Sequence, residues 1–139
     1  MNKCLSFCLF VLLLIPMVGY AQDTTAIALE DYVEELNSRC PIDYKDGWSI
    51  NSFTMVEDRY ALVDIGLPSS VSMFFSTLTA DNDKVKRLWI KQLKQYGEFW
   101  ERFVDMLVAA DRRLVINLCP GHPDSSALLT LRPSDFPKE

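Results

Sequence analysis

The stretch Asp83–Ala110, DKVKRLWIKQLKQYGEFWERFVDMLVAA, carries the clearest structural pattern of the chain. Large apolar and aromatic residues recur there at steps of three and four, which is the spacing of one helix face. The positions on this stripe are Val85, Leu88, Trp89, Gln92, Tyr96, Phe99, Trp100, Phe103 and Leu107. Because the pattern continues through Gly97, the sequence predicts one long amphipathic helix with a tolerated or kinked glycine. Each large buried side chain contributes roughly 1.5–3 kcal/mol, so we expect this helix to supply the largest share of the core.

Shorter patterns on both sides of this stretch predict two further helices and two β-hairpins. Apolar spacing predicts a helix that ends near Arg39, before Pro41, and a short one after Pro68. The runs that predict strands are Trp48–Val56, Tyr60–Ile65, Leu114–Leu118 and Ala127–Arg132. The resulting order, αββααββ, predicts an α+β fold: a four-stranded antiparallel sheet of two hairpins with the helices packed on one face.

The chain is expected to form one α+β domain, residues 22–133, between a leader and a tail. Residues 1–21 are typical of a signal peptide, with Lys3, an apolar run and the ending Gly19-Tyr20-Ala21 that suits signal peptidase. Cleavage after Ala21 predicts a periplasmic or secreted protein with no membrane anchor, and an uncleaved transmembrane anchor is the alternative. The polar, proline-containing residues 134–139 predict a flexible C-terminal tail.

The charge of the chain excludes one large class of partner. The net charge is −5 at pH 7, and removal of Lys3 with the leader makes the mature chain more acidic. Nucleic-acid binding needs clustered Lys and Arg, so no nucleic-acid partner is expected. The short basic run Lys84–Arg87 fits the solvent face of the long helix. The sequence leaves the oligomeric state open.

Two cysteines, Cys40 and Cys119, remain after cleavage. In an oxidising compartment an even number of cysteines permits a disulfide, and these two allow a single connectivity. Alternatively, both remain reduced and pack as small apolar residues. The sequence does not choose between these possibilities.

The loop after the third predicted strand carries the strongest chemical motif, a thiol, an imidazole and a carboxylate at Cys119, His122 and Asp124. Such residues can bind a metal or form a thiol nucleophile with its base. However, no second cluster supplies the remaining ligands of a closed zinc site, and Pro120-Gly121 and Pro123 are typical of a turn. The turn interpretation is favoured, so no catalytic residue, cofactor or metal is predicted, and these three positions stay weak metal candidates.

The segment Leu36–Asp43, LNSRCPID, ends the first helix with an Asn-x-x-Cys-Pro motif. Together with the leader ending Gly-Tyr-Ala-Gln, the hairpin Trp48–Tyr60 and the final hairpin Leu114–Leu131, it resembles small exported proteins of unknown function from Bacteroides and related bacteria. The resemblance implies a periplasmic or secreted α+β domain. It supplies no catalytic residues.

The function expected from these features is that of a non-catalytic binding or interaction module of the cell envelope. Its partner would be another envelope protein or a small ligand. One alternative is an envelope enzyme or metal-dependent protein that uses Cys119, His122 and Asp124. Another is an inhibitor or assembly partner that accepts a partner strand at the edge strand Ala127–Arg132.

Overall fold

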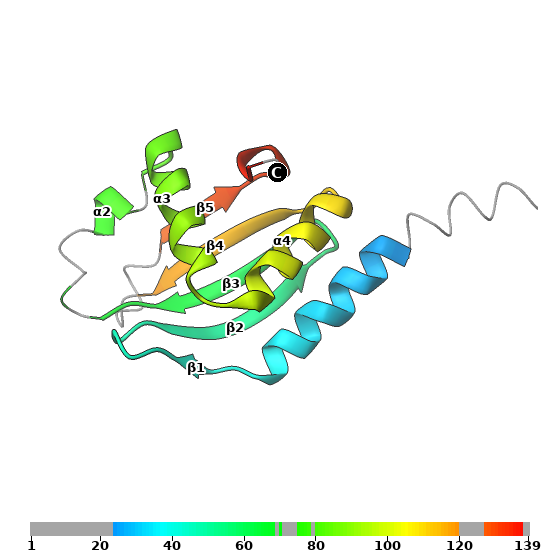
Figure 1. The fold of residues 1–139 in the computed structure, drawn as a ribbon, viewed down its shortest axis with the longest axis horizontal. Helices are drawn as coiled ribbons and strands as arrows, with labels where there is room; N and C mark the ends of the chain where they lie inside the picture. The colour runs from blue at the N-terminus through cyan, green and yellow to red at the C-terminus, as the bar shows by residue number, and fades with distance from the viewer. Residues whose placement is uncertain (1–23, 69, 71–74, 79, 120–126, 138–139) are drawn as a thin grey trace, which may run out of the picture.

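The computed structural model describes residues 24–68, 70, 75–78, 80–119 and 127–137 (Figure 1). Residues 24–38 form the N-terminal helix, which ends just before the predicted boundary at Arg39. It packs beside the aromatic helix region, where the Tyr32 hydroxyl donates to the Phe99 carbonyl oxygen at 3.3 Å. The guanidinium of Arg102 lies 4.8 Å from the centre of the Tyr32 ring.

The predicted long helix is two helices, α3 (Asp83–Lys94) and α4 (Glu98–Ala109). The prediction of one continuous helix was therefore wrong. Gly97 has φ of 113°, a backbone conformation that glycine adopts readily and other residues rarely do. Asn82 caps the start of α3, because its Oδ1 accepts a hydrogen bond from the Val85 amide at 2.9 Å. Leu88, which was placed on the buried stripe, is exposed.

Within the described residues, the sheet has five strands in the order β1-β2-β3-β4-β5. All neighbours are antiparallel except β3 and β4, which are parallel. The strands are β1 (Ile42–Asp43), β2 (Ser49–Val56), β3 (Tyr60–Gly66), β4 (Arg113–Cys119) and β5 (Ala127–Leu131). The predicted strand regions are thus confirmed within one or two residues at each end.

The predicted four-stranded antiparallel sheet was wrong in two respects. A two-residue strand, β1, adds to the edge beside β2, and it was too short to leave a periodic pattern. More importantly, the chain leaves β3 and passes through α2 (Phe75–Leu78), α3 and α4 before it returns as β4. Such a long helical crossover carries the chain back to the end of the sheet at which β3 begins. As a result, β4 runs in the same direction as β3.

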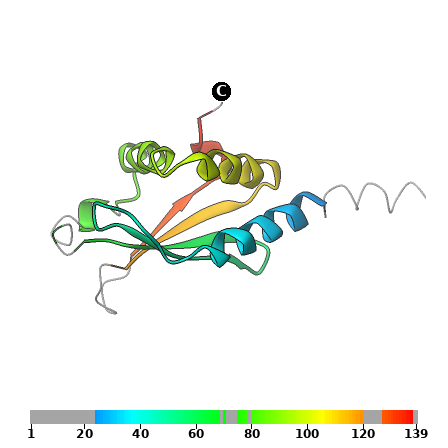
Figure 2. The same ribbon diagram turned by 60° about the horizontal axis from the view of Figure 1, so that its bottom comes forward.

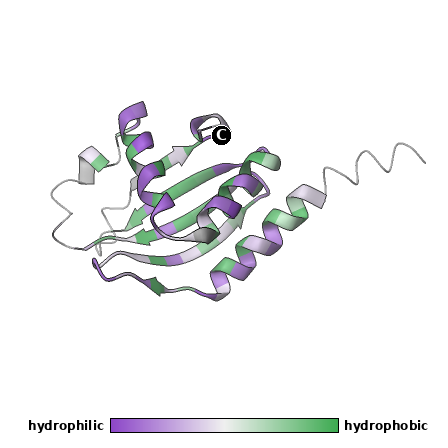
Figure 3. Ribbon diagram, viewed as in Figure 1, coloured by the Kyte–Doolittle hydropathy of each residue, from purple (hydrophilic) through white to green (hydrophobic). Residues whose placement is uncertain are grey.

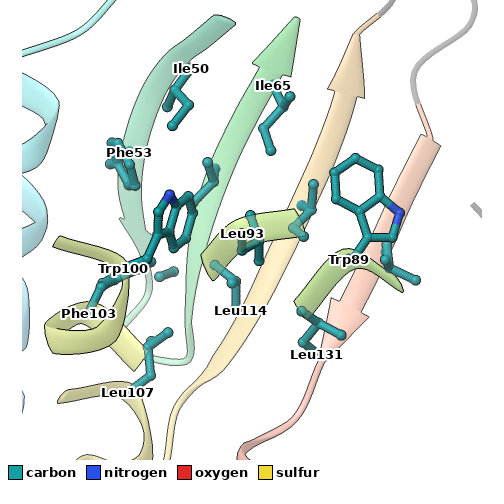
Figure 4. Close-up of a cluster of buried hydrophobic side chains, with 14 of the residues drawn as sticks. Ile50, Phe53, Ile65, Trp89, Leu93, Trp100, Phe103, Leu107, Leu114 and Leu131 are labelled. Carbon is teal, nitrogen blue, oxygen red and sulfur yellow. The ribbon is translucent and has the colours of Figure 1, made fainter. Parts of the chain in front are cut away.

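One face of the sheet lies beneath α3 and α4 (Figure 2). The central strands β3 and β4 are rich in apolar residues (Figure 3), and alternate residues of each strand point into a single core. Figure 4 shows Trp100 between Phe53 and Phe103, whereas Trp89 lies toward β5. The buried strand residues of this core are Ile50, Phe53, Ala61, Val63, Ile65, Leu114, Ile116, Leu118, Leu129 and Leu131.

The C-terminal segment packs against the helices as far as Phe136, within the residues that composition predicted to form a tail. A 3₁₀ turn, η2 (Pro133–Asp135), follows β5, and Phe136 beyond it is only 6% exposed. Asp135 Oδ2 accepts a hydrogen bond from the Arg132 amide at 2.8 Å and lies 3.4 Å from Lys86 Nζ on α3. The buried Phe136 side chain stabilises this segment against the helices.

Candidate functional site

An apolar groove of about 510 Å³ lies between α3, α4 and the C-terminal segment. Its floor is formed by side chains that also belong to the core, among them Leu93 and Trp100, both at most 2% exposed. Pro133 and Phe136 form the wall opposite the helices. The described residues that line it are Ile90, Leu93, Lys94, Trp100, Glu101, Val104, Asp105, Val108, Pro133, Phe136 and Pro137.

The rim of the groove combines apolar contact area with charge. Val104 and Val108 lie one helical turn apart on α4, and Val108 is exposed at the mouth of the groove. Glu101 and Asp105 occupy the same helix, and Lys94 lies at the end of α3. Concave apolar lining with a few charged groups is typical of a site that binds a ligand or a segment of another protein.

The wall made by the C-terminal segment limits what can bind. Pro133 and Pro137 have no backbone N–H, and most backbone N–H groups of α3 and α4 are bonded within their own helices. An extended peptide buried here would leave its own amide groups without partners, which is costly. An amphipathic helix satisfies its backbone internally, so the groove suits a helical segment.

Tyr96 lies beside the groove in an apolar environment. Its ring centre is 6.4 Å from that of Trp100 and 4.6 Å from that of Tyr44. Burial raises the pKa of Tyr96 to about 12, and the side chain of Gln92 offsets part of this rise. Among the described residues, the Tyr96 hydroxyl oxygen has no hydrogen-bond partner of good geometry. The neutral hydroxyl is therefore strongly favoured in the folded protein.

Replacement of Tyr96 by phenylalanine is expected to reduce the loss of stability at alkaline pH. The folded-state pKa lies above the unfolded value of 10.0, so unfolding releases the Tyr96 proton between pH 10.0 and about 12. The contribution of Tyr96 to the free energy of unfolding is therefore fully present below pH 10.0. It is lost as the pH rises from 10.0 to about 12. Urea unfolding of the wild type and Tyr96→Phe, from neutral to alkaline pH, measures the difference.

At neutral pH the Tyr96→Phe variant should match or slightly exceed the wild type in stability, because it removes a buried hydroxyl that has no partner of good geometry among the described residues. Some alkaline loss will remain, since burial also raises the pKa of Tyr32 and of Tyr44. Identical pH profiles for the two proteins would contradict the prediction.

The predicted chemical motif is only partly described. Cys119 ends β4, whereas His122 and Asp124 lie outside the described residues. Burial raises the pKa of the Cys119 thiol, and the Asp64 carboxylate raises it further, while the side chain of Asn117 partly lowers it. A reactive thiol requires the opposite shift. Within the described part of the chain, no group of three or more His, Cys, Asp or Glu residues is placed to hold a metal ion.

Cys40 and Cys119 are free thiols in the structure. Cys40 packs against the core after the N-terminal helix, where its Sγ lies 3.5 Å from the Leu36 carbonyl oxygen. Cys119 is on β4, on the sheet face away from the core, as the alternation with buried Leu118 requires. Three strand spacings, roughly 14 Å, separate β1 from β4, so the fold gives no support to the possible disulfide.

A polar cluster on this outer face was missed by sequence reasoning. Asn117 Nδ2 donates to Asp64 Oδ1 at 2.9 Å, and Ser52 Oγ donates to Asp64 Oδ2 at 2.8 Å. The three residues come from three different strands, and no local motif connects them. The wall that the C-terminal segment adds to the groove was also missed, although one signal for it existed: Phe136 is a large apolar residue inside a tail predicted to be flexible.

The edge strand predicted to accept a partner is β5, the last strand of the described sheet, which pairs with β4. Leu128 on this strand is 64% exposed. The position therefore agrees with the prediction, whereas pairing with a partner strand stays a prediction.

No helix among the described residues is both long and apolar enough to cross a membrane. No family model matches the chain, and comparison with curated proteins also finds no match.

Two solved structures share the architecture. One is PA3611, a Pseudomonas aeruginosa protein thought to be secreted, with 11% sequence identity and a TM-score of 0.56 over 82% of this chain and 94% of that chain. The other is EpsS, a pilotin of the Vibrio vulnificus type 2 secretion system, with 10% identity and a TM-score of 0.54 over 86% of this chain and 99% of that chain. At these identities the likeness establishes a common fold for the three proteins.

Proposed function

We propose that this protein is an exported, non-catalytic binding module that holds a helical segment of another envelope protein in the groove between α3 and α4. The observation that carries the proposal is the groove itself: an apolar floor of core residues, a charged rim and a proline-containing wall held in place by Phe136. The fold likeness to a secretion-system pilotin and to a protein thought to be secreted supports an envelope role.

The size of the groove is consistent with a short helical segment. Trp100 and Val108 are eight residues apart on α4, which corresponds to roughly 12 Å along the helix. A partner helix of two to three turns presents apolar side chains at i, i+3, i+4 and i+7 over this length. Lys94, Glu101 and Asp105 would then lie beside its polar flanks.

The test is a selection from a display library of random helical peptides against the mature domain, followed by affinity measurement for the enriched peptides. Val104→Arg introduces a large cation into the groove, and we expect it to weaken their binding at least about tenfold, because burial of an unpaired charge is unfavourable. The matched control is Leu128→Arg, which makes the same kind of change at an exposed apolar residue of β5 and should leave binding unchanged. Enriched peptides that bind all three proteins equally, or the absence of any binder, would contradict the proposal.

Export is tested separately by the intact mass of the full-length chain recovered from an envelope fraction without reductant. The expected mass is that of residues 22–139, because cleavage after Ala21 suits signal peptidase. The same spectrum reports whether Cys40 and Cys119 are reduced or bridged. An uncleaved chain would argue against the proposed route of export.

A further inference from the structure

A second hollow, of about 890 Å³, lies next to the groove. Its lining carries a positive charge, whereas the protein as a whole is acidic. It lies where the β2–β3 turn, the start of β4 and the end of β5 meet. Four arginines and two aspartates contribute to it, so its local charge is positive. The lining of this arginine hollow is Asp58, Arg59, Asp111, Arg112, Arg113, Arg132, Pro133 and Ser134.

One of the four arginines is already engaged in structural contacts. Arg112 Nη2 lies 3.2 Å from Asp58 Oδ2, its Nε donates to Asp58 Oδ1 at 3.4 Å, and its Nη1 donates to the Ala110 carbonyl oxygen at 2.8 Å. These contacts neutralise Asp58 and fix the guanidinium of Arg112 against the end of α4.

The other three arginines differ from Arg112 in their contacts among the described residues. Arg59, Arg113 and Arg132 form no ion pair with any described carboxylate, and Arg113 and Arg132 are exposed. These three arginines give the hollow an excess of positive charge, which attracts an anion. Planar guanidinium groups suit carboxylates in particular, because the two can form paired hydrogen bonds.

The groove and the arginine hollow are neighbours, since Pro133 contributes to the lining of both. The groove follows α4 as far as Val108, and the chain then reaches the hollow at Asp111 and Arg112. A segment lying along α4 in the groove therefore has one end at the arginine hollow. Toward its other end the segment passes Asp105 and then Glu101, which repel acidic side chains there.

We propose that the arginine hollow binds carboxylates at one end of the helical segment that occupies the groove. The proposal rests on the proposed function and specifies its partner: an amphipathic helix of two to three turns whose apolar stripe terminates in Asp or Glu side chains. The apolar groove provides contact area, and the charges at its two ends fix the direction in which the helix lies.

The experiment uses the same random peptide library, selected in parallel against the wild type and the double variant Arg113→Gln/Arg132→Gln. These two arginines are exposed and make no described ion pair, so their replacement should preserve the fold, which thermal unfolding verifies. Peptides enriched on the wild type should carry Asp or Glu at one end of the apolar stripe, and the double variant should lose this preference. An acidic-ended peptide should bind the double variant at least about tenfold more weakly, and its affinity for the wild type should fall with added salt.

The matched control is Glu101→Gln/Asp105→Asn, which changes two charges on the same rim without touching the hollow and should not weaken the acidic-ended peptide. Peptides that depend on Val104 but show no acidic preference would overturn this inference and leave the proposed function intact. If no enriched peptide is weakened by Val104→Arg, both fall. Stronger binding of phosphatidylglycerol vesicles than of any peptide, lost in the double variant, would overturn the inference in favour of a lipid.

Discussion

Replacement of Trp100 by alanine is expected to lower the free energy of unfolding by about 3–5 kcal/mol, because it leaves a cavity at the centre of the core. Trp100 is 1% exposed and joins α4 to the sheet. Its ring centre lies 5.1–6.4 Å from those of four other aromatic side chains, Phe53, Tyr96, Phe99 and Phe103. Urea unfolding followed by circular dichroism measures the effect without relying on tryptophan fluorescence.

Phenylalanine substitutions separate packing from hydrogen bonding. Trp100 Nε1 is buried and has no hydrogen-bond partner among the described residues, whereas Trp89 Nε1 donates to the Leu78 carbonyl oxygen at 2.8 Å. Trp100→Phe therefore loses only part of the ring, while Trp89→Phe also loses a hydrogen bond worth about 1 kcal/mol. We expect Trp89→Phe to be the more destabilising of the two. Equal costs for Trp100→Phe and Trp100→Ala would show that the aromatic contacts do not stabilise the core as described.

The apolar period predicted which side chains are buried better than it predicted the helix that carries them. Trp89, Trp100 and Phe103 all lie in the core as the stripe required. The break at Gly97 was missed because the pattern of apolar residues continues across it. The pattern of apolar residues around Gly97 is the same whether this glycine continues a helix or adopts its observed φ of 113°. Periodicity therefore carries no information on the backbone conformation at Gly97.

Local sequence patterns also could not predict the direction of β4. Strand propensity located β3 and β4, but propensity carries no information on which edge of the sheet a returning strand joins. Treating the two predicted hairpins as units led to an all-antiparallel sheet. The crossover through α3 and α4 determines the topology as much as the hairpins do, because it makes β3 and β4 parallel neighbours at the centre of the sheet.

The candidate site depends on the break at Gly97 and on the packing of the C-terminal segment. The groove exists because Gly97 separates α3 from α4 and because the C-terminal segment packs against the two helices. Its residues are spread from Ile90 to Pro137, so no motif of fixed spacing could have revealed it. The Cys119–Asp124 motif is recognisable in the sequence because reactive side chains lie close together in it. The groove is formed instead by residues that the sequence assigned to the core and the tail.

The parallel pairing has a measurable consequence at Asp64 and Asn117. These residues are direct partners in the β3–β4 ladder, and Asn117 Nδ2 donates to Asp64 Oδ1 at 2.9 Å. Asp64→Ala should cost about 1.5–3 kcal/mol, because it removes a charged acceptor and leaves the donors of Asn117 and Ser52 without a partner. Asn117→Ala should cost less, since Asn117 Oδ1 is already buried without a hydrogen-bond partner among the described residues.

The double variant Asp64→Ala/Asn117→Ala is therefore expected to be less destabilised than the sum of the two single variants, by about 0.5–3 kcal/mol in a double-mutant cycle. Thr54→Ala combined with Asn117→Ala serves as the control, because Thr54 is exposed on β2 and pairs with Leu62 of β3. That pair should be additive within about 0.5 kcal/mol. In an antiparallel sheet of two hairpins nothing would require Asp64 to face Asn117, so an additive cycle would contradict the parallel register of β3 and β4 itself.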